Sequence, residues 1–200
     1  MKFFADTAIN IEPDAETLAE MALMGAEVAE SLFDMTPKVA LLSFSNFGSV
    51  KHPFAQKVAA ALKLVQRIRP DLVVEGEIQA DTALSADVAA AFPHSRIKGD
   101  ANVLVFPDLQ SGNIGYKLLA HVAHATLVGP VLCGLAKPVN LLNHVASVDE
   151  IVRAVAITAV QAKGAPRKVL RGETPGRGEA AGKRQRKPVG VAVGFESEHD

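Results

Sequence analysis

The sequence predicts one soluble α/β domain from Met1 to about Lys163, with a mostly parallel sheet that helices cover on both faces. Three observations predict this fold class. Five short β-rich runs alternate with helical patterns, as in chains whose parallel strands are joined by helical crossovers. Most residues in these runs are consecutively apolar, which is typical of strands buried on both faces. With 200 residues, of which 48% are hydrophobic, the chain has enough material for a sizeable core.

The strands are expected in five runs: Phe3–Ile9, Lys38–Phe44, Leu72–Ile78, Asn102–Phe106 and Thr126–Gly134. The first helix follows Pro13, because apolar residues recur every three or four positions from Leu18 to Leu32. A second stripe runs from Phe54 to Ile68 and stops before Pro70, which disfavours helix in the residue before it.

The last predicted helix begins at Ser147 and runs to about Lys163. Ser147 and Glu150 have the S-x-x-E spacing of a capping box. Shorter helices are expected over Ser85–Phe92 and Asn113–Val122. Four apolar residues of the last helix are expected to face inward: Ile151, Val152, Val155 and Ala159.

The composition changes at Gly164. Residues 164–200 are rich in Gly, Lys, Arg and Glu and have no sustained apolar periodicity, so they are predicted to form a disordered tail. The basic cluster Lys183–Lys187 could contact nucleic acid or another protein, but a solvated tail without a dedicated partner is the simpler interpretation.

Charge and cysteine content exclude several classes of function. A net charge of −1 gives no electrostatic reason to expect nucleic acid or an anionic membrane as partner. The single Cys133 cannot form an intrachain disulfide, and its apolar neighbours favour a buried packing thiol over a nucleophile. No apolar run is long enough to span a bilayer and no signal peptide is recognisable, so a cytoplasmic location is expected.

Three loops that follow predicted strands carry groups suited to ligand binding: Ser43–Ser49, Glu75–Ala83 and Pro107–Asn113. Ligands of open α/β sheets bind beyond the carboxyl ends of the strands. Ser111, Gly112 and Asn113 would open a helix whose free N–H groups could hold an anion, with Lys117 one turn further on. The same residues are also ordinary helix-capping residues, and both interpretations stay open.

Metal binding and common nucleotide motifs find little support. His121 and His124 stand three apart on a predicted helix, but no third ligand recurs at metal-ligand spacing, and His52 and His94 are scattered. G-x-G-x-x-G, G-x-x-x-x-G-K-[ST] and G-x-S-x-G are all absent. We therefore expect no metal and no tightly bound cofactor.

Longer strings resemble a known family. ANVLVFPDLQSGNIGYKLL, VGPVLCGLAKPVN and SVDEIVRAVAITAVQA resemble the phosphate acetyl/butyryl transferases, or phosphotransacetylases, and ADTAINIEPDAETLAEMAL resembles the start of that family's second lobe. The resemblance covers about Phe3 to Ala162. LLSFSNFGSV and GEIQADTAL are most similar to the phosphotransacetylase-like domain at the C-terminus of bacterial NADP-dependent malic enzymes.

This resemblance implies a three-layer α/β/α fold, two lobes with a cleft between them, and dimers. It implies acetyl transfer between CoA and inorganic phosphate, in which a thiolate attacks an acyl phosphate. Because the chain starts where the second lobe starts, the first lobe is missing, which suggests a fragment, a split gene or a truncated chain.

The family's D-L-S-R-G signature is degenerate here. Its Ser corresponds to Asn143, its Arg to His144, and the acid that follows to Glu150. A His at the Arg position removes a permanent bidentate phosphate donor. Glu150 keeps a carboxylate, although its place in the capping box gives it a structural role, which we favour.

The leading hypothesis is a lobe that binds acetyl-CoA or acetyl phosphate and regulates or assembles a malic enzyme. The predicted ligand contacts are Ser43, Ser45, Asn113, Tyr116 and Lys117, with Asn143 and His144 at the phosphate end. One alternative is a genuine acyltransferase that is active when a separate first lobe docks, and another is a fragment without function. Without the first lobe, apolar surface is exposed, so association into oligomers is expected.

Overall fold

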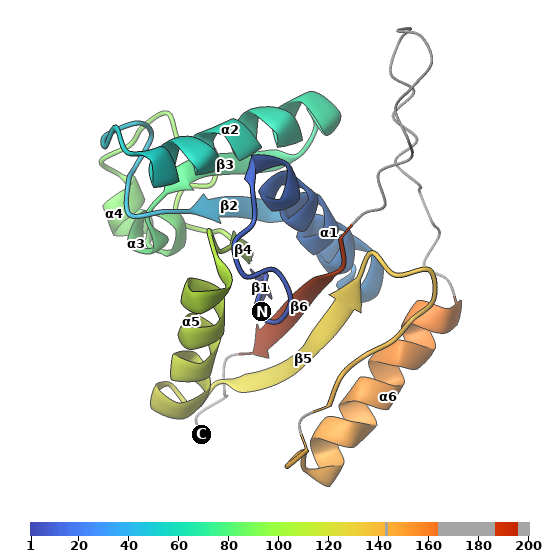
Figure 1. Ribbon diagram of the computed structural model, residues 1–200. Coiled ribbons are helices and arrows are strands. Elements are labelled where there is room, and N and C mark those ends of the chain that lie inside the picture. Colours follow the sequence, from blue (N-terminus) through green and yellow to red (C-terminus); the bar gives the residue numbers. More distant parts are fainter. Residues whose placement is uncertain (143, 164–186, 196–200) are drawn as a thin grey trace, which may run out of the picture.

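A six-stranded sheet organises the fold in the computed structural model, which describes residues 1–142, 144–163 and 187–195. Its strand order is β3-β2-β4-β1-β6-β5 (Figure 1). The strands β1 to β4 run parallel, whereas β6 is antiparallel to both of its neighbours, β1 and β5. The strand bounds are β1 Lys2–Ala5, β2 Lys38–Leu42, β3 Val73–Ile78, β4 Val103–Val105, β5 Thr126–Cys133 and β6 Val189–Phe195.

All five strands expected from the apolar runs are present, and each is shorter than its predicted run. The predicted α/β class with a mostly parallel sheet is confirmed. The helices are α1 Ala15–Phe33, α2 Pro53–Ile68, α3 Ala80–Leu84, α4 Ala86–Ala89, α5 Leu109–Val122 and α6 Val148–Lys163.

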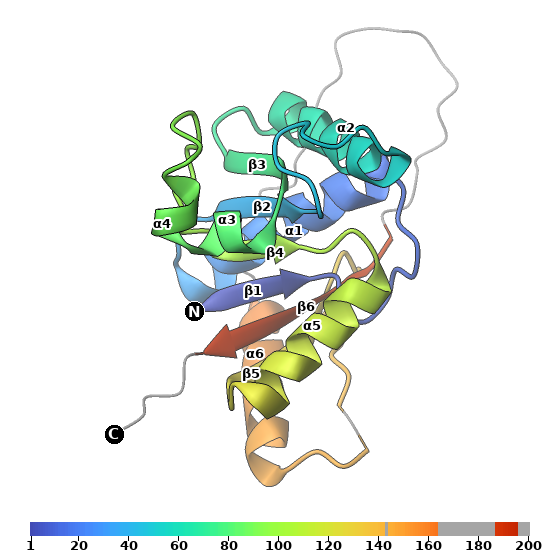
Figure 2. The same ribbon diagram turned by 90° about the vertical axis from the view of Figure 1, so that its left-hand side faces the viewer.

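Two apolar clusters cover the two faces of the sheet. The larger cluster joins α1 and α2 to one face through side chains such as Met21, Val65 and Val103. On the other face, Phe4, Ile78 and Leu104 pack with residues of α3 and α5 in a smaller cluster. Figure 2 shows α5 in front of the sheet and α1 behind it, so the molecule has three layers.

The helix boundaries follow from local chemistry. Asp14 caps α1, since its carboxylate accepts a hydrogen bond from the N–H of Thr17 at 2.8 Å. His52 caps α2, where Pro53 occupies the first position and needs no N–H partner. The helix expected from Asn113 begins at Leu109 instead, because Asp108 is its cap. The segment expected as a helix over Ser85–Phe92 forms only α4, and α3 lies just before it.

The prediction of a disordered tail is wrong for Val189–Phe195. These residues form β6, which lies inside the sheet between β1 and β5. Its sequence VGVAVGF alternates valines with small residues, and this short alternation is masked by the polar composition around it. Residues 164–186 and 196–200, with most of the basic cluster Lys183–Lys187, lie outside the described residues.

The predicted inward face of α6 is also wrong. Ile151, Val152, Val155 and Ala159 are all exposed, with Val152 60% and Val155 62% accessible. Only Ile157 of this helix packs against the larger apolar cluster. The helical period in the sequence was correct, but the chain contains no described element that covers this face.

Among the described residues, no helix has both the length and the apolar character required to cross a membrane.

Candidate functional site

A cavity of about 590 Å³ lies at the carboxyl ends of β2 and β4. Ser43 and Phe44 line it directly after β2, and Pro107 and Asp108 line it after β4. The start of α2 contributes two further side chains, Phe54 and Lys57, and the loop after β1 contributes Ile11 and Glu12. This is the edge of the sheet where ligands of open α/β folds bind.

Of the five residues predicted as ligand contacts, only Ser43 lines this cavity. Its backbone N–H donates to the carbonyl of Ile78 at 2.9 Å, which fixes the loop after β2 to the end of β3. Its side chain is half-buried at the cavity wall.

The two polar loops after β2 and β3 bond mainly to each other. Ser45 is fully buried and donates to the carboxylate of Glu77 at 2.9 Å, which also accepts from the N–H of Gly48 at 2.6 Å. Asn46 and Gln79 exchange two hydrogen bonds, of 2.7 and 3.0 Å. Since buried polar groups are costly unless paired, these contacts hold the loops together and take Ser45 away from the cavity.

The start of α5 is capped internally. The carboxylate of Asp108 accepts from the N–H of Ser111 at 2.8 Å, and the hydroxyl of Ser111 donates to the carbonyl of Asp108 at 2.9 Å. Asn113 donates its side-chain amide to the carbonyl of Thr7 at 3.1 Å. An anion at this terminus would face a carboxylate that already occupies the first turn, so the geometry favours the capping interpretation.

Tyr116 and Lys117 lie further along α5. Tyr116 is half-buried against the smaller apolar cluster, and this burial raises the pKa of its hydroxyl. Lys117 is exposed and does not line the cavity at the carboxyl ends of β2 and β4. Neither contact has been tested, and both stay predictions.

Of the residues matched to the family's signature and acid, His144 precedes α6 and Glu150 lies in its first turn. His144 is exposed, and Asn143 lies outside the described residues. Glu150 forms the predicted capping box: its carboxylate accepts from the N–H and the hydroxyl of Ser147 at 2.6 and 2.8 Å, and its own N–H donates back to that hydroxyl. These hydrogen bonds from Ser147 hold the pKa of Glu150 below its usual range.

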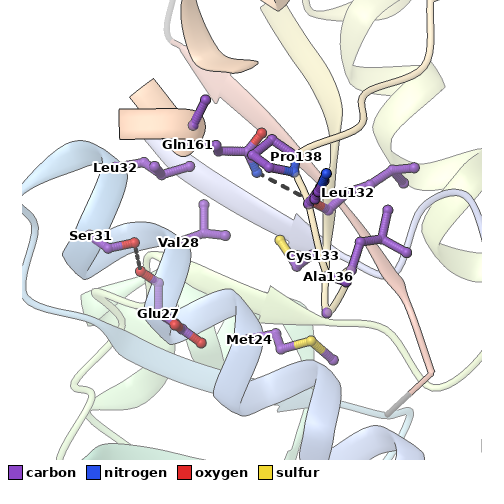
Figure 3. Close-up of a pocket in the computed structure, with 14 residues that line it drawn as sticks. Met24, Glu27, Val28, Ser31, Leu32, Leu132, Cys133, Ala136, Pro138 and Gln161 are labelled. Carbon is purple, nitrogen blue, oxygen red and sulfur yellow. Dashed lines mark hydrogen bonds between the residues drawn. The ribbon is translucent and has the colours of Figure 1, made fainter. Parts of the chain in front are cut away.

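Cys133 lines a separate cavity of about 340 Å³ between α1 and the segment that follows β5. Figure 3 shows its sulfur among Met24, Val28 and Leu132. Burial, with smaller contributions from the carboxylates of Glu27 and Asp6, raises the pKa of the thiol to about 12. Cys133 is therefore protonated at neutral pH, as a packing thiol would be.

Within the described ranges, no three His, Cys, Asp or Glu side chains come together in a way that could hold a metal ion.

Sequence reasoning missed Lys57 at this cavity and Asp6 in the loop after β1. Lys57 brings a cation to the cavity and donates from Nζ to the carbonyl of Pro107 at 2.9 Å. Asp6 is fully buried after β1, and its carboxylate accepts from the N–H groups of Ala8, Ile9 and Asn10 at 2.8 to 3.1 Å. In the sequence, the only sign of the buried Asp6 was its spacing from Asn10 within one short loop.

Comparisons with known proteins place this geometry in a family. The model of the family described as Phosphate acetyl/butaryl transferase matches residues 1–159. The phosphate acetyltransferase of Clostridium acetobutylicum is 49% identical over 161 residues, which cover 80% of this chain and 48% of that protein. The NADP-dependent malic enzyme of Escherichia coli is 46% identical over 166 residues, which cover 82% of this chain but 22% of that enzyme.

Solved structures agree. A phosphotransacetylase from Streptococcus pyogenes matches with a TM-score of 0.75 and 42% identity over 80% of this chain and 53% of its own. The EutD phosphotransacetylase from Staphylococcus aureus matches with a TM-score of 0.74 and 44% identity over 78% of this chain and 48% of its own. This chain spans about half the length of the phosphate acetyltransferases of Clostridium acetobutylicum, Thermoanaerobacterium thermosaccharolyticum and Bacillus subtilis. It belongs to the phosphate acetyl/butyryl transferase family.

Proposed function

We propose that this domain binds acetyl-CoA or acetyl phosphate as the regulatory, oligomerising C-terminal part of an NADP-dependent malic enzyme. The match to the Escherichia coli malic enzyme supports this context, because nearly the whole described domain corresponds to a minor part of a much longer enzyme. CoA and phosphate are then ligands rather than resident cofactors.

The observation that carries the proposal is the state of Glu150. At the position of the family's acid, its carboxylate is bonded twice to Ser147 and stabilises the start of α6. Its Oε2 accepts both hydrogen bonds from Ser147, which leaves this oxygen less available to accept a thiol proton. His144, at the position of the family's Arg, lacks that residue's permanent charge. This pair of residues supports the proposal of binding without efficient turnover.

For the bound ligand, we propose contacts from Ser43 in the cavity and from Asn113, Tyr116 and Lys117 on α5. Lys57 adds the charge that a phosphate or CoA pyrophosphate needs at this edge of the sheet. Phe44 and Phe54, which are 51% and 62% exposed, offer aromatic surface beside it.

The second candidate is a genuine acyltransferase whose first lobe is supplied separately. The phosphate acetyltransferases, at 47 to 49% identity and about twice the length, favour this reading. In that reaction the CoA thiolate attacks the acetyl carbon of acetyl phosphate, and phosphate leaves. The separate lobe would have to supply the base and most of the phosphate contacts.

Two measurements on the full chain separate these candidates. Calorimetry is expected to detect acetyl-CoA binding, weakened in Ser43→Ala and Lys57→Ala but unchanged in Ser31→Ala, a control on the exposed surface of α1. Acetyl phosphate formation from acetyl-CoA and phosphate is expected to stay at background, alone and with the first half of the Clostridium acetobutylicum enzyme. Turnover in the mixture would favour the second candidate, and a well-folded chain without acetyl-CoA binding would contradict both.

A further inference from the structure

The strand β6 has an unusual place in the fold. It lies in the interior of the sheet, where it hydrogen-bonds to β1 on one side and to β5 on the other. It also comes from outside residues 1–159, the part of the chain that matches the family. Within the described residues, β5 pairs with β6 and with no other strand, so β6 joins β5 to the rest of the sheet (Figure 1).

The two faces of β6 differ, and each fits its surroundings in the gap between β1 and β5. Val189, Val191 and Val193 are fully buried on the face toward the larger apolar cluster. The opposite face carries only small residues. A Cβ added to Gly190 would lie 2.7 Å from the Cβ of Ala8, and one added to Gly194 would lie 3.0 Å from the ring of Phe4. The gap therefore selects an extended segment in which valines alternate with small residues.

Polar contacts fix the start of the strand. The N–H of Gly190 donates to the buried carboxylate of Asp6 at 3.1 Å, and its carbonyl accepts from the N–H of Thr7 at 3.0 Å. The side-chain amide of Asn10 donates to the carbonyl of Pro188 at 2.9 Å. Asp6, Thr7 and Asn10 all belong to the loop after β1. This loop therefore binds the backbone of Pro188 and Gly190 and fixes the register of β6.

The chain between α6 and β6 leaves room for exchange. Residues 164–186 separate Lys163 from Lys187, and a segment of that length can extend to about 80 Å. The number of linking residues is therefore large enough for β6 to reach the sheet of a second copy of the chain.

From these observations we propose that the gap between β1 and β5 is a strand-binding site. Its ligand is the segment Pro188–Phe195 as an independent extended peptide, which a second copy of the chain can supply as well as the chain itself. The binding mode is strand addition, in which main-chain hydrogen bonds give affinity and the alternating side chains give specificity.

The test starts from the folded full-length chain. A site-specific protease sequence is placed within residues 164–186, and the folded protein is cut there. The fragment that contains β6 is expected to remain bound through gel filtration. When the cut protein is unfolded and refolded with a tenfold excess of a fluorescent peptide of residues 187–196, the peptide is expected to replace most of the fragment.

Two peptide variants make the test specific. Gly190→Val in the peptide is expected to incorporate at least about tenfold less, because the added side chain meets Ala8. Lys187→Ala is the matched control, since this residue is exposed and precedes the strand, and it should incorporate like the unmodified peptide. Because both changes are in the peptide alone, the protein body is identical in every sample.

Loss of the fragment on cutting, with the circular dichroism of the sheet retained, would overturn the proposal. Incorporation of the Gly190→Val peptide equal to that of the unmodified peptide would overturn it too, because the site would then not discriminate between the two sequences.

Discussion

The region built on β1 to β4 and the region built on β5 and α6 use their side chains in opposite ways. In the first region, polar residues of the loops bond to one another, as Ser45 and Glu77 do, and apolar residues such as Met21 of α1 and Val65 of α2 are buried. In the second, the apolar residues of α6 are exposed, with Val148 75% accessible. The apolar face of α1 is therefore covered within the chain, whereas α6 carries an apolar surface suited to contact with another protein.

The largest expected effect concerns Asp6, which connects the two regions. Its carboxylate bonds to the loop after β1 and to Gly190 of β6. Asp6→Ala leaves the buried N–H of Gly190 and three half-buried N–H groups of the loop without their acceptor, so the free energy of unfolding should fall by at least about 3 kcal/mol. Urea unfolding measures this. Asp87→Asn, at an exposed position of α4, is the control, and an equally small change for Asp6→Ala would show that β6 is not anchored there.

A smaller effect compares buried and exposed apolar residues directly. Met21→Ala on α1 should lower the free energy of unfolding by about 2–4 kcal/mol, because Met21 is fully buried in the larger cluster. Val155→Ala on α6 should change it by less than about 0.5 kcal/mol. A large cost for Val155→Ala in a monomer would mean that α6 is covered after all.

The exposed face of α6 also predicts association. Val152→Glu with Val155→Glu should reduce self-association seen by gel filtration with light scattering and leave the far-ultraviolet circular dichroism unchanged. Glu20→Gln with Glu27→Gln on α1 serves as a control for altered charge. An unmodified chain that is monomeric by gel filtration with light scattering at all concentrations would contradict the prediction.

The last prediction concerns the capping box of α6, whose expected effect is small. Ser147→Ala should cost about 1 kcal/mol, since it removes the hydroxyl that bonds to Glu150. Because the pKa of Glu150 is lowered in the folded chain, its contribution is present above the unfolded pKa and is lost as the pH falls through the lower folded value. The difference between wild type and Ser147→Ala should therefore shrink in acid, as measured by urea unfolding from pH 7 to pH 3. A difference that stays constant would mean that the carboxylate has no part in the cap.

The same contrast explains how far the sequence could predict the molecule. Periodicity identifies α1 and α2, and continuous apolar runs identify the first five strands, since most of these apolar residues are covered by elements of the same chain. It also identifies α6 but assigns its face wrongly, because a helical period does not say which surface will cover it. β6 was missed since its two-residue alternation depends on glycines, which as a composition indicate a loop.

For the site, the residue types in the loops predicted where these loops lie but not which partners their side chains bind. The loops after β2, β3 and β4 were correctly assigned to the carboxyl edge, and Ser43 does line a cavity there. Pairing could not be read from one sequence: Ser45 bonds to Glu77, and Asn113 bonds to Thr7, across 32 and 106 positions. Lys57 was missed because nothing in its own helix marks it as adjacent to Pro107.

The position of β6 sets an order of opening for the molecule. The backbone groups of β5 have partners in β6 and in no other described strand, so an event that frees β6 also frees β5, while β5 can open alone. In native-state hydrogen exchange, the amides of β5 that bond to β6 can then be no more protected than the segment that holds them. The stability of the outer edge of this sheet is thus limited by residues that follow it in the chain by more than fifty positions.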